Sequence, residues 1–291
     1  MDKRKNSMVS VCMITYGHEM FIRQAIEGVL MQEFDSEIEL IIANDCSPDS
    51  TDAVIQEVIK HHPRGFWIQY SRHNSNIGMM PNFIFALEQC TGKYIALCDG
   101  DDYWTDPLKL QKQVDFLENN DGFSMCFHDA VVLHNNKKVD FYVNKNKTVF
   151  STDDLFNRHF IPTASIVFRN ILDYPEWFTH VASGDRLLVL LVSEIGKIKC
   201  LDDVMAVYRL HNGGVSNTHF GIKKVYDTAL LLHRFNELTG FKFTQQSYNS
   251  LAYEIHEHVC SENKSLNYYT TNELLNEILT RIKKRLKKIF K

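Results

Sequence analysis

The sequence predicts an α/β protein whose first half is a largely parallel sheet covered by helices. Short, almost continuously apolar runs alternate with segments of helical periodicity, and polar residues follow the apolar runs where a strand would end. Strands buried on both faces by crossover helices read as such continuous apolar runs. Ligands of these sheets bind at the carboxyl ends of the strands, so functional residues are expected there.

Four strands and three helices are expected in the first part of the chain. The second strand ends at a cluster of Asn, Asp, Ser and Pro residues, which breaks the strand and begins the next helix. In order, the expected elements are a strand at Val9–Ile14, a helix at Met20–Met31, a strand at Glu39–Ala43, a helix at 51–60, a strand at Phe66–Ser71, a helix at Pro81–Gln89 and a strand at Tyr94–Cys98.

The second part is less regular and becomes mostly helical towards its end. Residues 134–150 are polar and indicate a loop or a hairpin. The absence of a repeat or a low-complexity linker favours one α/β domain over residues 1–217, followed by a helical extension over 218–291. The expected elements are a helix at Pro107–Leu117, strands at Ser124–Leu133 and Ala164–Phe168, a helix at Arg186–Ile195, a strand at Ile198–Leu201, and helices at 221–239, 245–261 and 271–290.

The composition is that of an ordinary globular protein, with 44% hydrophobic and 23% charged residues. No apolar run follows the basic N-terminus, and no window approaches the roughly 18 apolar residues of a membrane-spanning helix. The seven cysteines are widely scattered and contain no C-x-x-C pair. This spacing is typical of reduced thiols and not of a disulfide framework or a zinc site. We therefore expect a cytoplasmic protein.

The last eleven residues, 281–291, carry seven basic side chains and no acidic one, although the whole chain has a net charge of −4. Apolar residues over 272–291 recur at helical spacing, so the pattern fits a helix lying on an anionic membrane surface. The alternative is a helix packed on the body of the protein with solvated lysines. We expect peripheral attachment to the inner face of the cell membrane. Nucleic acid is not expected as a partner, because the rest of the chain is acidic and would repel phosphates.

The segment Asp99-Gly100-Asp101-Asp102 places three carboxylates directly after a buried strand. Like charges at such short range resist joint ionisation unless a cation is present. Oxygen ligands of this kind suit Mg²⁺ or Mn²⁺. The alternative is a solvated acidic turn, in which Asp102 or Asp106 caps the following helix. Asp45, at the end of the second strand, favours the metal site because it adds a further carboxylate at the same edge.

Five segments, taken in this order and spacing, resemble the signature of family 2 glycosyltransferases. They are Val9–Tyr16, Ala25–Gln32, Glu39–Thr51, Asn74–Gly78 and Asp99–Leu110. The resemblance spans about residues 8–217. It implies a GT-A fold, with a nucleotide-binding half at about 8–106 and an acceptor-binding half at about 107–217. It also implies inversion of the anomeric centre by a single displacement, with no covalent nucleophile.

The resemblance further implies a binding site for the nucleotide of the donor sugar. Thr15 and Tyr16 would line the pocket, with Tyr16 stacking near the uracil. Asp45 would accept a hydrogen bond from N3–H of the base, and Glu19 would touch the nucleotide. Family members usually carry Asp-Asp at this strand end, whereas this chain has Asn44 before Asp45. This difference from the family pattern leaves the second carboxylate, that of Asp45, in place.

By the same resemblance, Asp99 and Asp101 form the D-x-D signature. Asp99 would face the ribose or the metal, and Asp101 would bind the metal directly. The segment Tyr208–Ser216 resembles a downstream motif of the family, in which His211 could bind the metal or the diphosphate and Arg209 could pair with a carboxylate or phosphate. A purely structural role for His211 is the alternative.

Asp185 lies in a segment that resembles the second acidic motif of the family, and we expect it to be the general base. It could also cap the helix that begins there, and the two roles are compatible. The chain lacks a Q-x-x-R-W motif after Asp185 and an apolar spanning segment. Both absences favour transfer of single sugars over processive polysaccharide synthesis.

These observations lead to a hexosyltransferase that uses a nucleotide-sugar, most simply a UDP-sugar, with Mn²⁺ or Mg²⁺. The expected acceptor is a saccharide or lipid-linked glycan in surface polysaccharide assembly. A sugar-nucleotide nucleotidyltransferase is one alternative, but Thr15–Glu19 is poorly suited to bind a triphosphate. A non-catalytic carbohydrate- or membrane-binding protein is another. The donor sugar, the acceptor, and whether the chain forms a homo-oligomer are left open.

Overall fold

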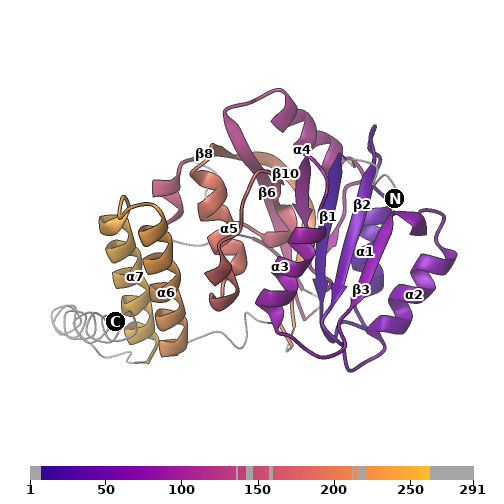
Figure 1. Cartoon of the computed structure of the whole chain (residues 1–291), viewed down its shortest axis with the longest axis horizontal. Helices are drawn as coiled ribbons and strands as arrows, with labels where there is room; N and C mark the ends of the chain where they lie inside the picture. The colour runs from indigo at the N-terminus through magenta and orange to yellow at the C-terminus, as the bar shows by residue number, and fades with distance from the viewer. Residues whose placement is uncertain are drawn as a thin grey trace. The chain divides into compact units, whose positions relative to one another are not determined.

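A computed structural model describes residues 8–135, 137–141, 147–156, 160–211, 213–214 and 221–262 (Figure 1). The chain divides into two compact units. The first holds the described residues of Met1–Thr152 and Phe160–Asn212, and the second holds those of Asp153–His159 and Gly213–Lys291. Residues 153–156 thus belong to the helical unit although strands of the first unit lie both before and after them in sequence. The expected helix at 271–290, with its basic residues, lies outside the described residues.

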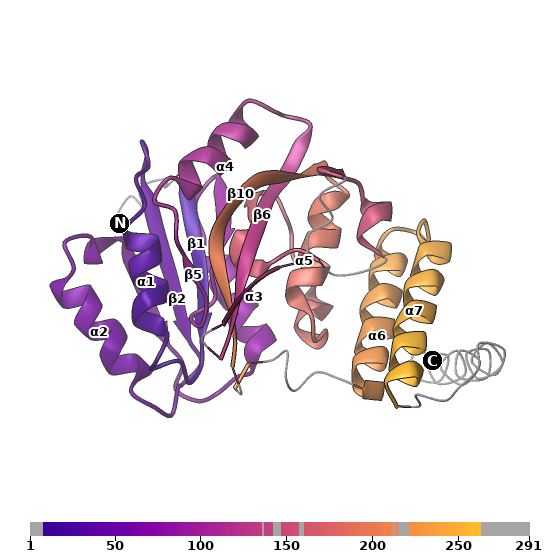
Figure 2. The ribbon, with the colours of Figure 1, turned by 180° about the vertical axis from the view of Figure 1, so that it is seen from behind.

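The first unit begins as the predicted parallel sheet. Strand β1 pairs in parallel with both β2 and β4, and β2 pairs with β3, so the spatial order is β3-β2-β1-β4. Helices α1 and α2 lie on one face of these strands and α3 lies on the other, as the two opposite views show (Figures 1 and 2). The elements are β1 (Val9–Thr15), α1 (Ile22–Leu30), β2 (Ile38–Asn44), α2 (Thr51–His61), β3 (Ile68–Arg72), α3 (Met79–Gln89) and β4 (Tyr94–Leu97). This arrangement confirms the predicted α/β fold class.

The sheet then continues with strands of mixed direction. Strand β9 runs antiparallel between β4 and β6, β6 pairs in parallel with β10, and β5 runs antiparallel on the other side of β10. Strands β6 and β7 form the hairpin that was one of the two alternatives for 134–150. The elements are β5 (Tyr103–Trp104), α4 (Lys109–Glu118), β6 (Phe123–His134), β7 (Lys137–Asp140), β8 (Val149–Phe150), β9 (Val167–Arg169), α5 (Gly184–Ser193) and β10 (Lys197–Leu210).

Strand β10 is much longer than the predicted Ile198–Leu201. The predicted strand ended before Asp202 and Asp203, and aspartate is depleted in strands. The structure continues through them with register shifts against β6 between Leu201 and Ala206. Such irregularities let a strand pass residues that would not fit a regular ladder. Strand β10 therefore extends as far as Leu210, directly before His211.

Helix α1 approaches β5 closely because Gly28 has no side chain. A Cβ atom at Gly28 would lie 3.0 Å from the backbone nitrogen and oxygen of Trp104. On the same helix, Ile22, Ile26 and Val29 are fully buried in the hydrophobic core. This packing fixes the position of the segment that carries the three carboxylates, because that segment leads directly into β5.

The second unit contains the helical pair α6 (Gly221–Leu238) and α7 (Thr244–Glu262). These bounds confirm the predictions of helices at 221–239 and 245–261. The turn between them holds Gly240 and Phe241 at positive φ, of 62° and 64°. Phe243 stacks with Phe235 at 5.7 Å between ring centroids and packs against Phe156 in a tilted arrangement at 5.3 Å. None of the helices in the described part of the chain is long and apolar enough to cross a membrane.

Lys109, at the start of α4, is a fully buried amine. Its Nζ donates to Oε1 of Gln113 at 2.7 Å and lies 4.1 Å from the centroid of the Trp104 ring. Burial lowers the pKa of Lys109 to about 7, because removal from water disfavours the charged form. The folded chain therefore releases this proton at a lower pH than the unfolded chain does.

We predict that Lys109→Met changes the pH dependence of stability. Below pH 7 the lysine is protonated in both the folded and unfolded states, so the variant has its largest advantage in free energy of unfolding there. Between pH 7 and about 10 the unfolded state binds more protons, and this advantage falls by about 1.4 kcal/mol per pH unit. Urea denaturation of both proteins at several pH values measures this difference in the free energy of unfolding. A difference that does not vary with pH would contradict the assigned pKa.

Candidate active site

The carboxyl ends of β1, β2 and β4 meet at one edge of the sheet, as predicted. The N–H of Asp45 donates to the carbonyl of Thr15 at 3.0 Å, and the N–H of Gly100 donates to the carbonyl of Ile14 at 2.9 Å. The loops that follow the three strands are therefore held together by their backbones. Side chains from all three strand ends gather at this edge of the sheet.

Asp101 and His211 are in direct contact in this structure. Nε2 of His211 lies 3.0 Å from Oδ2 of Asp101, although 110 residues separate them in sequence. The contact follows from the topology, because β5 begins just after Asp101 and pairs with β10, which ends just before His211. Phe21 packs against the His211 ring, with 4.6 Å between centroids.

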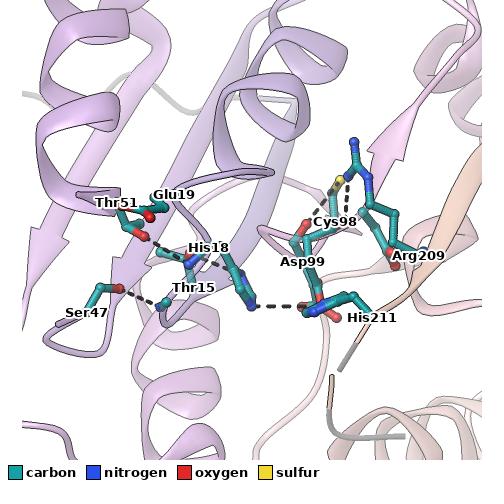
Figure 3. A network of polar contacts seen from close by, with 12 residues as sticks. Thr15, His18, Glu19, Ser47, Thr51, Cys98, Asp99, Arg209 and His211 are labelled. Atoms are coloured by element: carbon teal, nitrogen blue, oxygen red, sulfur yellow. Dashed lines mark hydrogen bonds and ion pairs between the residues drawn. The ribbon is translucent and has the colours of Figure 1, made fainter. Parts of the chain in front are cut away.

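A second histidine, His18, approaches the same carboxylate from the loop after β1. Its Nε2 lies 3.8 Å from Oδ2 of Asp101, and its Nδ1 lies 3.2 Å from Oγ1 of Thr15 (Figure 3). Ligand atoms of His18, Asp101 and His211 all lie within 4.8 Å of one another. Among the described residues this is the one group of three or more His, Cys, Asp or Glu side chains close enough to share a metal ion.

Arg209 has a structural role, because it holds the acidic segment Asp99–Asp102 in place through hydrogen bonds. Its backbone N–H donates to Oδ1 of Asp102 at 2.8 Å, and its guanidinium donates to the carbonyl of Asp101 and to Oε1 of Gln24. The guanidinium also lies over the ring of Tyr103 at 4.3 Å. The alternative in which Asp102 caps the next helix is wrong, because that carboxylate is buried against Arg209. Asp106 accepts the N–H of Leu108 at 2.8 Å instead.

The three carboxylates of the segment titrate differently. Burial and the charges of Asp101 and Asp185 raise the pKa of Asp99 to about 8. Burial and the charge of Asp101 raise the pKa of Asp102 well above its usual value. Burial also opposes ionisation of Asp101, but the hydrogen bond with His211 and the charge of His18 outweigh it and lower its pKa. Asp101 is therefore the carboxylate of the three that ionises most readily.

Asp45 is buried and holds the loop that precedes α3. Its Oδ1 accepts the N–H of Ile77 at 2.7 Å and its Oδ2 accepts the N–H of Gly78 at 2.9 Å. Asn44, which replaces the usual first Asp, accepts the N–H and the hydroxyl of Ser47 and donates to the hydroxyl of Tyr70. The amide can therefore act as donor and acceptor at once, which a carboxylate could not do.

The other residues predicted to bind the nucleotide lie around the same edge. The side chain of Thr15 is buried against His18, whereas Tyr16 is 48% exposed. Glu19 is exposed, and its Oε2 accepts the N–H of Ser50 at 2.9 Å, next to the start of α2. Its own N–H donates to Asp49 at 3.0 Å. Glu19 thus fixes the loop, and its contact with a nucleotide stays a prediction.

Asp185 is the second residue of α5, whose N-cap is Ser183, so the alternative in which Asp185 is the helix N-cap is wrong. Its Oδ1 accepts the N–H of Arg186 at 2.8 Å, and its Oδ2 accepts the hydroxyl of Thr163 at 3.2 Å. Gly184, the residue before it, packs against Met80, and a Cβ at Gly184 would lie 2.4 Å from Cε of Met80, so that side chain would have to shift. The charge of Asp185 acts on Asp99, so the two carboxyl groups share one electrostatic environment.

His18 is the residue of this site that the sequence-based reasoning missed. The sequence offers one signal for it, which is its place three residues after the end of the first strand, between the predicted nucleotide residues Tyr16 and Glu19. Its orientation depends on a contact made with another segment, because its N–H donates to Oγ1 of Thr51 at 2.9 Å. Nothing in the local sequence predicts that contact.

The fold is an α/β domain with carboxylates and histidines gathered at the carboxyl edge of its sheet. A family-wide sequence profile described as "Glycosyl transferase family 2" matches residues 10–174. The chain therefore belongs to glycosyl transferase family 2, and the predicted GT-A domain of a glycosyltransferase is confirmed at the level of family and fold.

Known proteins support this assignment. An uncharacterized protein of Mycobacterium tuberculosis strain H37Rv is 37% identical over 209 residues, which cover 71% of this chain and 60% of the relative. This chain thus spans about three fifths of the length of that relative. The Escherichia coli UDP-Glc:alpha-D-GlcNAc-diphosphoundecaprenol beta-1,3-glucosyltransferase WfgD is 25% identical, over 76% of this chain and 84% of WfgD.

A solved structure shows the same fold at low sequence identity. The mannosyltransferase PcManGT of Pyrobaculum calidifontis, in complex with GDP-Man and Mn²⁺, superposes with a TM-score of 0.62 and 14% identity. The superposition covers 96% of this chain and 81% of PcManGT. At this identity the likeness concerns the fold alone.

We predict that Gly100→Ala disturbs the site from within. A Cβ at Gly100 would lie 2.7 Å from Oγ1 of Thr15 and 3.0 Å from Nδ1 of His18. Overpacking of this kind costs about 1–3 kcal/mol of unfolding free energy. Gly122→Ala is the matched control, because a Cβ there meets nothing within 4 Å. Chemical denaturation of both variants measures the cost, and equal stability of the two would contradict the close packing around Gly100.

Proposed function

We propose that the chain is an inverting glycosyltransferase that moves a single sugar from a UDP-sugar to a hydroxyl of a saccharide or lipid-linked glycan. The observation that carries the proposal is the 3.0 Å contact between Asp101 and His211 at the carboxyl edge of the sheet. An ionised carboxylate beside an imidazole at this edge suits a cation that holds a diphosphate. Asp99 and Asp185 supply further carboxyl groups close by.

The nucleotide of the donor would bind over the ends of β1 and β2. Tyr16 offers a half-exposed ring for stacking on the base, next to the buried Thr15. Asp45 already accepts two backbone N–H groups, but a carboxylate has about four acceptor sites, so it can also accept N3–H of uracil. The UDP-glucose named as the donor of WfgD supports a uridine nucleotide. Glu19, which is exposed at the edge of this site, would also contact the nucleotide.

The residues present fit a divalent cation, Mn²⁺ or Mg²⁺. Asp101 has a lowered pKa and is ionised at neutral pH, and His211 places a ring nitrogen beside it. Such an ion, when bound, offsets the negative charge that develops on the departing diphosphate. The Mn²⁺ in the complex of PcManGT supports this assignment. Asp99, with its pKa of about 8, can donate a hydrogen bond to the ribose or to a phosphate oxygen in its protonated form.

Asp185 would act as the general base. The acceptor hydroxyl oxygen forms a bond to C1 of the sugar while the bond from C1 to the diphosphate oxygen breaks, and Asp185 takes the hydroxyl proton. The N–H of Arg186 and the hydroxyl of Thr163 orient its carboxylate for this role. Attack from the side opposite the leaving group inverts the anomeric centre in one step.

The acceptor and the location follow from the same proposal. The lipid-linked GlcNAc named as the acceptor of WfgD supports a lipid-linked glycan in surface polysaccharide assembly. Such an acceptor would bring the enzyme to the inner face of the cell membrane, where the basic residues 281–291 would contact anionic lipids. The formation of a homo-oligomer is left open. A degenerate, non-catalytic site is the alternative that the next experiments exclude or support.

We predict that Asp185→Asn lowers sugar transfer by about 10²- to 10⁴-fold, because a positioned base typically contributes that much. Binding of the UDP-sugar, measured by calorimetry, should stay unchanged. The acceptor would be chosen from a panel of saccharides and polyprenyl-diphosphate-linked sugars. Asp121→Asn is the matched control, since the side chain of Asp121 is fully exposed. Full transfer by Asp185→Asn would remove Asp185 from the mechanism.

We also predict that Asp101→Ala abolishes metal-dependent binding of the donor. The measurement is calorimetric binding of a panel of UDP- and dTDP-sugars with and without Mn²⁺. The native chain should bind one or more UDP-sugars more tightly with Mn²⁺, and Asp101→Ala should lose that gain. If the variant gained as much from Mn²⁺ as the native chain, Asp101 would not be the metal ligand. If no nucleotide-sugar bound the native chain, the proposed function itself would fail.

A further inference from the structure

Two hydrogen bonds to a neighbouring segment hold the backbone at His18 in place. Its backbone N–H donates to Oγ1 of Thr51 at 2.9 Å, and the N–H of the preceding Gly17 donates to Oγ of Ser47 at 3.0 Å. The hydroxyl of Thr51 donates in turn to Oδ1 of Asp49 at 2.6 Å. The loop after β1 is therefore fixed to the segment between β2 and α2 (Figure 3).

The ring of His18 is also oriented by a polar contact. Nδ1 lies 3.2 Å from Oγ1 of Thr15, and when Nδ1–H donates to that hydroxyl, the lone pair of Nε2 is left to face Asp101. Histidines that bind metals typically use one nitrogen for the metal and donate the other N–H to a neighbouring oxygen. Gly100 makes room for this pair, since a side chain there would collide with both Thr15 and His18.

The spacing fits coordination better than a hydrogen bond. The 3.8 Å between Nε2 of His18 and Oδ2 of Asp101 is too long for a hydrogen bond. An ion whose bonds to ligands are about 2.1 Å long can bridge two atoms up to roughly 4.2 Å apart. The His211 nitrogen lies 3.0 Å from the same oxygen, so Asp101 stands between two imidazoles that come from different segments.

We propose that His18 is a third protein ligand of the cation, so that the site consists of two imidazoles and one carboxylate. This inference rests on the proposed function and sharpens it, because it concerns which ion the enzyme uses. Imidazole nitrogen favours transition metals, whereas Mg²⁺ prefers oxygen ligands and water. The site should therefore select Mn²⁺, or a later transition ion such as Co²⁺, over Mg²⁺. The remaining coordination positions stay available to the diphosphate.

The test measures binding of Mn²⁺ to the full chain without nucleotide, with electron paramagnetic resonance as the readout. His18→Ala should weaken Mn²⁺ binding at least about tenfold, since even the loss of an outer-shell partner typically costs 10- to 100-fold. Mg²⁺ in large excess should displace little Mn²⁺ from the native chain. His61→Ala is the matched control, because His61 is exposed on α2 and its Nδ1 lies 3.0 Å from the carbonyl of Glu57 on the same helix.

A pulsed measurement separates coordination from mere positioning. Spin-echo modulation from imidazole nitrogen should indicate two directly bound histidines in the native chain and one in His18→Ala. Equal modulation in both proteins, or unchanged Mn²⁺ affinity, would overturn the proposal. This outcome is distinct from failure of the proposed function. If the chain binds Mn²⁺ through two imidazoles but transfers no sugar, His18 is a metal ligand and the proposed function is wrong. If it transfers sugar with Mn²⁺ bound through one imidazole, the proposed function holds and His18 is not a ligand.

Discussion

Three carboxyl groups lie close together after β4, and the surrounding structure must accommodate their mutual repulsion. Asp99, Asp101 and Asp102 lie within four residues, and burial together with mutual repulsion raises the pKa of the first and the third. Of the three, Asp101 alone has a lowered pKa, because His211 and His18 face it. The site thus presents one readily ionised carboxylate between two imidazoles. The proposed metal binding and the proposed choice of metal both follow from this arrangement.

The fold creates that arrangement through the pairing of β5 with β10. Gly28 lets α1 approach the backbone of Trp104, which fixes β5, and β5 pairs with the end of β10. Arg209, near that end, bonds to both Asp101 and Asp102 and prevents the acidic segment from separating from the strand. His211 follows two residues later and meets Asp101. The chemistry of the site therefore depends on a strand pairing that spans more than 100 residues of sequence.

The parallel half of the fold was predictable from the sequence because buried strands and crossover helices leave strong local patterns. The gathering of Asp45 and Asp99–Asp102 at one edge followed from the same patterns, since parallel strands end together. The length of β10 was not predictable in this way. Asp202 and Asp203 read locally as a turn, and the pairing with β6 that carries the strand past them is a tertiary effect.

The individual site residues also differ in whether the sequence alone could predict them. Asp101 and His211 were named because they match motifs of the family, and the structure brings them together. His18 could not be identified, because its orientation is set by Thr51 and Thr15, and the bond to Thr51 reaches across 33 residues. The role of Asp185 as a base rests on family resemblance, since its contacts with the N–H of Arg186 and the hydroxyl of Thr163 orient the carboxylate but do not by themselves assign it a reaction.

In the proposed site, the carboxylate of Asp101 together with His211 and His18 holds the cation that serves the donor nucleotide. A crystal structure of the chain with Mn²⁺ and UDP, measured at the manganese absorption edge, tests it most directly. We expect one anomalous peak within about 2.3 Å of Oδ2 of Asp101 and of Nε2 of both histidines, with the diphosphate beside it. A peak bound by Asp99 or Asp102 instead, or none beside Asp101, would contradict it.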